Sequence, residues 1–291
     1  MKYFKFLFVI TAGIFLACQP KRMVEKPVVV TSISVYEDLV KQIAGSACEV
    51  HSLVQGMENP HTFDLSGSKI RQVAQADLLV LNGLGLEGWS RQLLAGIDTS
   101  HTRYVFVADS LMNSPLLIHN DNPHFWMDPR IGQQIVNILL PEIQALVPDS
   151  QAIFRERAAG YLEELEQLHH DIGVKLEPLK SNKVIAQTPG LDYFFSAFGI
   201  ERTDVIVSHP GTEPSARKMK ELVDLLQTGE VFAIIRFPQF SEKLPQTLST
   251  ESNVPVVLMS PLINGAPYVE TYIDLIWFNA DALANIASPN A

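Results

Sequence analysis

The chain has 291 residues, 47% of them hydrophobic and 19% charged, which is enough for one large or two ordinary globular domains. This composition excludes an intrinsically disordered chain. The formal net charge of −10 argues against a nucleic-acid surface, because phosphate binding requires clustered lysine and arginine.

The N-terminus has the pattern of a secretory signal. Two lysines precede a short uncharged run that ends at Cys18, and such a run is too short for a membrane span. The residues before Cys18 resemble a bacterial lipoprotein cleavage site, with Phe15 where such sites usually carry leucine. We therefore predict a signal peptide over 1–17, lipidation of Cys18 and a flexible tether over 18–26. The alternative is a simple cleaved signal with an incidental cysteine.

One cysteine, Cys48, is left in the mature chain, and a single cysteine forms no internal disulfide. It lies in a strand-like run, which favours a small buried hydrophobic side chain over a reactive thiol. Stability must then come from packing.

Strands and helices are predicted to alternate in the first half of the chain. An acid before a proline predicts that Asp128 caps a helix whose first residue is Pro129. From Ser150 to Leu179 apolar residues recur every three or four positions, which predicts one long amphipathic helix. The predicted strands are 28–35, 48–54, 77–83 and 103–109.

The alternation resumes after the long helix, with strands expected at 183–188, 204–209, 231–237 and 254–259 and a last helix near 268–286. Strands alternating with helices predict parallel sheets covered on both faces. We therefore predict the α/β class: two parallel-sheet lobes, 27–149 and 181–291, joined by one long rigid helix over 150–180. Ligands of such sheets bind near the carboxyl ends of strands, so the cleft between the lobes is the expected site.

Two of the eight histidines stand out because both follow Asn-Pro. They are His61 in ENPHTFDL and His124 in NPHFWMDP. Proline restricts its own backbone and that of the preceding residue, which limits the conformations of a ligand-bearing loop. The other histidines of the strands, loops and long helix are interpreted as structural or surface residues: His51, His101, His169 and His170.

Acidic residues stand near both Asn-Pro-His segments and are able to ligate a metal directly or to orient an imidazole. They are Glu58, Asp64, Asp121 and Asp128. The pattern favours a metal site, while the alternative is two coincidental turns, with Asp128 only a helix cap.

Several segments together resemble the family 9 solute-binding proteins, the metal-binding receptors of bacterial ABC importers for zinc and manganese. The resemblance covers nearly all of the mature chain, and its segments are 60–89, 122–130, 209–226, 237–252 and 272–283. It implies two lobes linked by a rigid helix, zinc or manganese held between them as transported ligand, and delivery to a membrane permease. It also implies an extracytoplasmic location, in the periplasm or at the cell surface.

Carried over to this sequence, the resemblance assigns His61 and His124 as the two ligands of the N-terminal lobe. The C-terminal lobe departs from the family pattern. The third ligand, usually His or Glu, falls on Thr188, and the fourth, usually Asp or Glu, falls on Ser260. Neither hydroxyl is a good ligand for zinc or manganese.

Three accounts of this departure stay open. In the first, His209 and Glu213 in SHPGTEPS supply replacement ligands, although Glu213 also suits the start of the next helix. In the second, two histidines bind metal weakly and water completes the shell. In the third, the pocket takes another ligand, such as a metal chelate or a small anion facing Arg236, whose alternative role is to pair with a surface acid.

The leading hypothesis is a non-enzymatic, monomeric lipoprotein receptor for a divalent transition metal, with an ABC permease as its partner and no nucleic acid. A metal-dependent hydrolase is the weaker alternative, because such sites need three protein ligands and an open water position. The third hypothesis is a surface interaction or adhesion lipoprotein of the same fold with a degenerate metal site.

Overall fold

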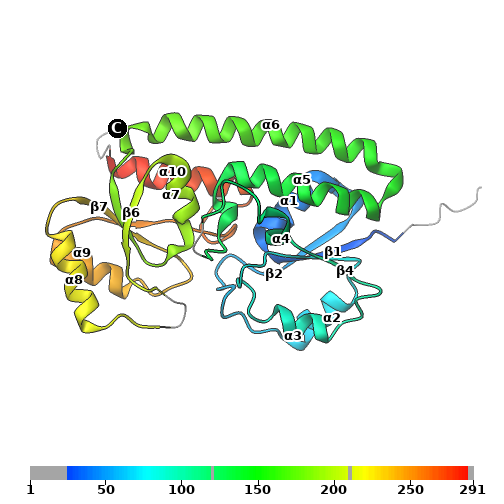
Figure 1. Ribbon diagram of the computed structural model, residues 1–291, viewed down its shortest axis with the longest axis horizontal. Coiled ribbons are helices and arrows are strands. Elements are labelled where there is room, and N and C mark those ends of the chain that lie inside the picture. Colours follow the sequence, from blue (N-terminus) through cyan, green and yellow to red (C-terminus); the bar gives the residue numbers. More distant parts are fainter. Residues whose placement is uncertain (1–24, 119–120, 209–211, 288–291) are drawn as a thin grey trace, which may run out of the picture.

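The structure is a computed structural model that describes residues 25–118, 121–208 and 212–287. It has two α/β lobes side by side, with one long helix lying across both (Figure 1). Each lobe contains a four-stranded sheet, and all strand pairs in both sheets are parallel. The fold class predicted from the sequence is confirmed.

The N-terminal lobe is built on a sheet of strand order β2-β1-β3-β4. These strands are β1 (Val28–Ile33), β2 (Glu49–Val54), β3 (Leu78–Leu81) and β4 (Arg103–Phe106). Helices cover both faces of the sheet, as Figure 1 shows. One face carries α1 (Ser34–Ala44), α4 (Val107–Leu111) and α5 (Pro129–Leu146), and the other carries α2 (Gly67–Ala74) and α3 (Ser90–Ala95).

The C-terminal lobe repeats this plan with the strand order β6-β5-β7-β8. The strands are β5 (Lys183–Ala186), β6 (Glu201–Val205), β7 (Val231–Arg236) and β8 (Val256–Leu258). One face of the sheet is covered by α7 (Asp192–Phe198) and α10 (Tyr272–Ala287), and the other by α8 (Ala216–Leu226) and α9 (Lys243–Ser252).

The long helix α6 (Gln151–Leu176) has 26 residues, which corresponds to about 39 Å at 1.5 Å per residue. A 3₁₀ turn, Glu177–Leu179, extends it to the end of the segment expected to be helical. Its buried residues recur every three or four positions and face α1, α5 and α10. They are Phe154, Ala158, Tyr161, Leu165, Leu168, Ile172 and Leu176. The helix therefore packs against elements of both lobes.

Burial on both faces explains why the strands are almost uninterrupted apolar runs. In β1, Val29 belongs to the core under α6, whereas Val30 belongs to a separate core beneath the sheet. In β5, Val184 and Ile185 divide in the same way. The core under α6 continues through both lobes, so the lobes share one packed layer.

Two predictions about single residues are confirmed. Asp128 is 2% exposed and caps α5 by accepting a hydrogen bond from the Arg130 backbone N–H at 2.9 Å, and Pro129 is the first helical residue. Cys48 is buried, and burial raises the pKa of its thiol to about 11. Such a thiol stays protonated at neutral pH and is a poor nucleophile.

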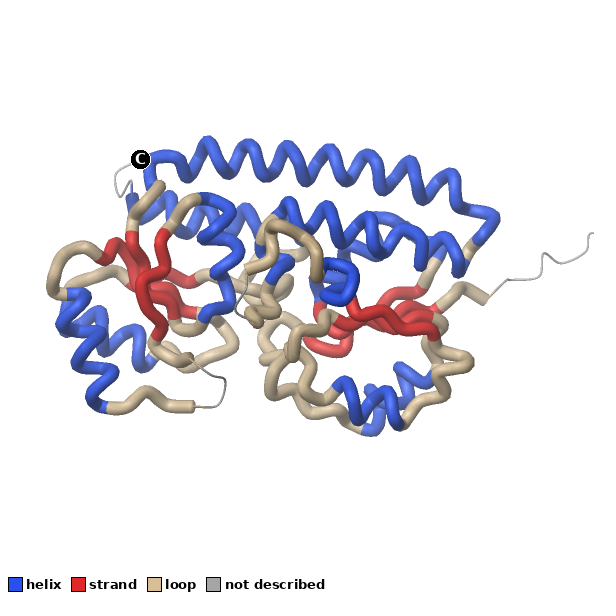
Figure 2. The backbone as a smooth tube through the Cα atoms, viewed as in Figure 1, coloured by secondary structure: helices blue, strands red, loops and turns tan. Residues whose placement is uncertain are grey.

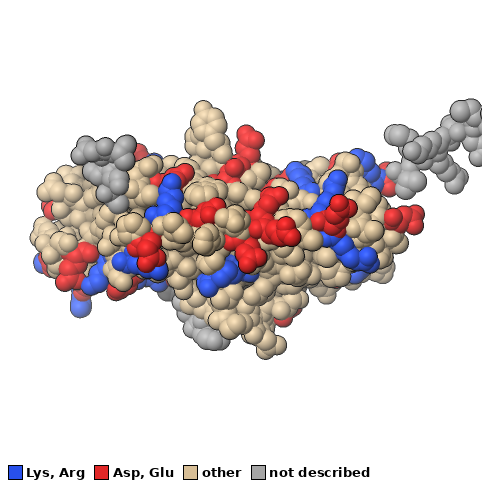
Figure 3. Space-filling view, turned by 90° about the horizontal axis from the view of Figure 1, so that it is seen from above, with Lys and Arg blue, Asp and Glu red and all other residues tan. Residues whose placement is uncertain are grey.

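The face along α6 carries acidic and basic side chains mixed together, with no extended basic patch among its described residues (Figure 3). Among the residues that the structure describes, no helix combines the length and the apolar run that a membrane crossing requires.

Candidate metal site between the lobes

A cavity of about 450 Å³ lies between the two lobes and is lined by residues of both. Loops crowd together where the two sheets face each other (Figure 2). Most of the lining lies at or after the carboxyl ends of β2, β5, β6, β7 and β8, in the segments 59–61, 188–192, 205–208, 237–240 and 261–262. The cavity therefore lies where parallel sheets bind their ligands.

The two Asn-Pro-His histidines meet at this cavity, although 63 positions separate them in the chain. Nε2 of His61 lies 3.2 Å from Nε2 of His124, and the ring planes are inclined by 54°. Two bonds of 2.0–2.1 Å from imidazole nitrogens to one tetrahedral zinc ion place the nitrogens about 3.3 Å apart. The observed separation therefore suits two ligands of a single ion.

Both Asn-Pro-His segments form the same local turn. The side-chain oxygen of Asn59 accepts a hydrogen bond from the backbone N–H of His61 at 3.0 Å. The side-chain oxygen of Asn122 does the same for His124, also at 3.0 Å. An asparagine bonded to the backbone two residues on is an Asx turn, and the proline between restricts the backbone further. The motif thus fixes each histidine locally.

Each turn is also anchored through its proline carbonyl. Pro60 accepts a hydrogen bond from the Trp89 indole at 3.1 Å, and Pro123 accepts one from Asn82 Nδ2 at 3.1 Å. Asn82 is fully buried, and its backbone N–H donates to the Glu87 carboxylate at 2.7 Å. Burial raises the pKa of Glu87. These buried contacts hold the histidine loops against the N-terminal lobe.

The protonation state of both imidazoles suits metal binding. His124 Nδ1 lies 2.8 Å from the oxygen of Asn122, which can only accept, so Nδ1 carries the hydrogen and Nε2 presents its lone pair. Burial, reinforced by the neighbouring His61, lowers the pKa of His124 to about 3. Burial also lowers the pKa of His61. Both rings are therefore neutral at pH 7, the form that ligates a metal.

Asn122 also links the histidine loop to the opposite lobe. Its Nδ2 donates to the Pro189 carbonyl at 2.9 Å and to Asp192 Oδ2 at 3.3 Å. Asp192 is buried and forms a bidentate pair with Arg202, at 2.5 and 2.8 Å. A single amide thus orients His124 with its oxygen and reaches the C-terminal lobe with its nitrogen.

Two positions depart from the family pattern, Thr188 and Ser260, and they differ in whether they reach the cavity. Thr188 lines the cavity. A Cβ added to Gly190 would lie 3.5 Å from Thr188 Oγ1 and 3.8 Å from His124 Cδ2, so both side chains approach the same point. Ser260 is fully buried, and its hydroxyl donates to the Leu262 carbonyl at 2.8 Å. Only Thr188 is thus placed to meet a ligand beside His124.

His209 lies outside the described residues, so its role as a replacement ligand stays a prediction. Glu213 is exposed and does not line the cavity, and its role also stays a prediction. Asp121 is exposed and lines the cavity. Glu58 and Asp64 are also exposed but do not line it. Within the described residues no group of three His, Cys, Asp or Glu side chains could hold a metal.

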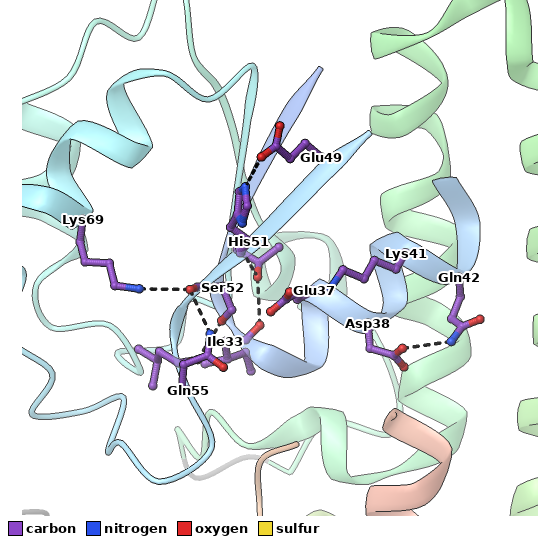
Figure 4. A network of polar contacts seen from close by, with 12 residues as sticks. Ile33, Glu37, Asp38, Lys41, Gln42, Glu49, His51, Ser52, Gln55 and Lys69 are labelled. Atoms are coloured by element: carbon purple, nitrogen blue, oxygen red, sulfur yellow. Dashed lines mark hydrogen bonds and ion pairs between the residues drawn. The ribbon is translucent and has the colours of Figure 1, made fainter. Parts of the chain in front are cut away.

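The other histidines that the structure describes lie away from the cavity. His51 on β2 contacts Glu49 at 2.9 Å, and the nearby Lys69 donates to the Ser52 carbonyl, which ties α2 to the strand before the His61 loop (Figure 4). His101 and His170 are exposed. His169, which was expected at the surface, is half-buried against Phe198 because its side of α6 faces α7.

Arg236 does not line the cavity and lies 3.6 Å from Glu242, so the pairing with a surface acid describes it better than an anion site.

Comparison with known proteins agrees with this architecture. Residues 29–286 match the family model described as ZnuA, zinc-uptake complex component A, periplasmic. The chain belongs to this family. Family membership confirms the predicted resemblance to metal-binding receptors of ABC importers and a solute-binding role rather than an enzymatic one.

Three curated relatives of this ZnuA-family chain show the range of the similarity. A putative metal-binding protein of Thermotoga maritima is 29% identical, over 88% of this chain and 91% of the relative. The manganese-binding lipoprotein MntA of Halalkalibacterium halodurans is 26% identical, over 88% and 87%. The zinc-binding lipoprotein AdcA of Streptococcus pneumoniae is 24% identical over 90% of this chain, which spans only 56% of AdcA.

Solved structures in the same family share the fold. The periplasmic zinc-binding protein TroA from Treponema pallidum superimposes with a TM-score of 0.82 at 23% identity, over 90% of this chain and 99% of TroA. A crystal structure of ZnuA gives a TM-score of 0.79 at 24% identity, over 90% and 99%. At these identities the likeness concerns the fold alone.

The sequence did not predict several residues at the site, among them Asn122, Asp192 and Gln239. An Asn directly before Pro-His carries a visible signal, since asparagine commonly bonds the backbone two residues on. Asp192 and Gln239 carry no local signal. Their contacts to Asn122 and to the Gly56 carbonyl cross between lobes, over 70 and 183 positions.

Proposed function

We propose that this protein is the extracytoplasmic solute-binding component of an ABC importer, which captures a divalent transition metal, zinc or manganese, between its lobes and delivers it to a membrane permease. The single observation that carries the proposal is the pair of neutral imidazole nitrogens 3.2 Å apart at the inter-lobe cavity. Membership in the ZnuA family and relatives named zinc-binding and manganese-binding lipoproteins support it.

Capture begins with two lone pairs that are already aimed at one point. The Asx turns and the Trp89 and Asn82 anchors hold His61 and His124 before the ion arrives, which lowers the entropy lost on binding. Because both rings are neutral at pH 7, the ion displaces no proton from them.

The ion is linked to the second lobe through Asn122 instead of through a metal ligand on Thr188 or Ser260. A bound cation withdraws electron density from the His124 ring, which strengthens the hydrogen bond from His124 Nδ1–H to the Asn122 oxygen. The Nδ2 of Asn122 in turn donates to Pro189 and Asp192. This path lets a bound cation stabilise the closed contact between lobes. The shared core under α6 keeps the accompanying movement small.

The proposal includes membrane attachment of a monomer. Residues 1–17 would be a signal peptide, Cys18 the lipidated first residue and 18–26 the tether, followed by the two lobes and linking helix with the boundaries given above. Cys18 lies outside the described residues. Relatives named lipoproteins support this part of the proposal.

The test is zinc and manganese titration of the purified protein by calorimetry, together with elemental analysis, for His61→Ala and His124→Ala. We expect each substitution to weaken binding by at least about 100-fold, because a ligand is lost and not only an outer-shell group. His51→Ala and His101→Ala, which remove exposed or half-buried imidazoles away from the cavity, are the matched controls. Unchanged metal content in both cavity variants would contradict the proposal.

His209→Ala belongs in the same series, because it separates two forms of the proposal. A loss equal to that of His124→Ala assigns a third imidazole to the site. An unchanged affinity leaves His61 and His124 as the protein ligands. Thermal unfolding of each variant shows whether a loss of metal reflects the site or the fold.

A further inference from the structure

The cavity is much larger than a metal ion requires. Its volume is about 450 Å³. Water molecules completing the shell of an ion held by two imidazoles take about 30 Å³ each, so two of them fill only a small part of this space. A volume of about 300 to 1,000 Å³ is typical of sites for small organic molecules.

The C-terminal wall of the cavity is chiefly apolar, which suits an organic group better than a hydrated ion. Val205, Val207, Phe237, Phe240 and Leu262 contribute to it. Phe237 and Phe240 contact each other with ring centroids 6.5 Å apart. Water around a bare ion gains nothing from such a surface, whereas an aliphatic or aromatic group is stabilised by leaving water.

One polar group in the same wall is placed to bind the head of an organic molecule. Arg202 lines the cavity and uses Nε and Nη2 for Asp192, and Nη1 makes no hydrogen bond within the described part of the chain. A guanidinium N–H suits a carboxylate. The neighbouring Gln239 donates from Nε2 to the Gly56 carbonyl, and its side-chain oxygen is closed off from the cavity.

We propose that the cargo is the metal ion together with a small bidentate chelator of the α-amino carboxylate class. This inference rests on the proposed function and specifies its substrate. His61 and His124 supply two positions of a four-coordinate ion, and the amine nitrogen and a carboxylate oxygen of the chelator supply the other two. The amino group releases one proton to solvent when it coordinates. Arg202 binds the remaining carboxylate oxygen, and the side chain of the chelator packs on Phe240.

Such a complex removes the need for metal ligands at Thr188 and Ser260. The chelator fills the positions that the C-terminal lobe would otherwise supply, and it also joins the two lobes through contacts to the apolar wall. The small Thr188 side chain and Gly190 beside His124 leave room for it.

The experiment measures the affinity of the purified protein for free zinc in a metal buffer. The signal is the intrinsic tryptophan fluorescence, to which Trp126 contributes. The Trp126 ring lies 5.3 Å from the His124 ring and therefore reports on the site. The additions are zinc alone, or zinc with saturating glycine, L-leucine or N,N,N-trimethylglycine. The last compound keeps the carboxylate but has no amine lone pair with which to chelate.

We expect the dissociation constant for free zinc to fall at least about tenfold with glycine and further with leucine, by linkage between the two ligands. Trimethylglycine should leave it unchanged, and Phe240→Ser should reduce the advantage of leucine over glycine. Equal affinity in all four conditions overturns the chelate proposal while leaving metal capture intact. Absence of zinc binding in every condition overturns the proposed function instead.

Discussion

The two walls of the inter-lobe cavity are built in opposite ways. The N-terminal wall presents two neutral imidazoles fixed by Asx turns and by hydrogen bonds from Trp89 and Asn82. The C-terminal wall presents mainly apolar side chains, and its buried acid, Asp192, is already paired with Arg202. The comparison teaches that one wall presents the two imidazoles that we propose as metal ligands, while the other presents an apolar surface and contacts the first lobe.

The two lobes also meet at Gly56, where its backbone approaches the backbone of residues 263–265. A Cβ at Gly56 would lie 2.1 Å from the Asn264 carbonyl carbon and 2.3 Å from the Gly265 nitrogen. Gly56→Ala should therefore disrupt the contact between the lobes and lower the free energy of unfolding by about 3 kcal/mol, because the facing backbone cannot move aside as a flexible side chain can. Chemical denaturation measures this loss.

Gly88→Ala is the matched control, since a Cβ there meets nothing within 4 Å. It should change stability by no more than about 0.5 kcal/mol. Equal stability of both variants would show that the lobes are not pressed together at Gly56.

Acid should lower the free energy of unfolding of the metal-free protein through His124, in the N-terminal wall. The folded-state pKa of His124 is lowered to about 3 from 6.5, so the unfolded chain binds more protons between these values. Stability therefore rises with pH across that window, and going from pH 7 to pH 5 should cost about 2 kcal/mol through this one residue. Denaturation of wild type and His124→Phe at both pH values measures the difference.

The phenylalanine variant keeps an aromatic ring but has no titrating group, so its stability should fall less over the same pH range. An equal fall in both proteins would assign the acid sensitivity to other groups.

Paired substitutions at the two asparagines separate the role of the turn from the role of the link between walls. Asn122→Asp keeps the oxygen that accepts from His124 but loses the N–H donor to Pro189 and places a second carboxylate beside Asp192. We expect zinc affinity to fall about tenfold, as for other outer-shell changes. Calorimetric titration measures it.

Asn59→Asp keeps the corresponding turn oxygen at His61, and no hydrogen bond from the Asn59 amide nitrogen to the other lobe is present within the described residues. It should leave zinc affinity within about threefold of wild type. If both aspartate variants bind zinc equally well, the amide of Asn122 does not link the walls.

Much of the fold followed from local pattern. Strand runs such as 28–33 and 231–236 are apolar at nearly every position because helices cover both faces of each sheet. The Asp128-Pro129 start of α5 and the long helix α6 were predicted from capping chemistry and from apolar spacing. These features depend on neighbours a few positions apart.

The site was predicted less completely. His61 and His124 carried a local signal in Asn-Pro, but the pairing of Asp192 with Arg202 needs α7 and β6 side by side. Ser260 was considered as a ligand position, yet its hydroxyl is used by the Leu262 carbonyl, which a sequence pattern does not reveal. The hydrogen bond from Gln239 to the Gly56 carbonyl joins the two lobes over 183 positions, which no local pattern reveals.

The sequence by itself determined two parallel α/β blocks around one long helix and two histidines braced by Asn-Pro, because periodicity, capping and turn chemistry act over a few residues. Only the tertiary structure decided that these imidazoles, 63 positions apart, bring their nitrogens within 3.2 Å and face an apolar wall. The physical reason is that strand order and the shared core under α6 set which loops meet, and those depend on contacts across the whole chain.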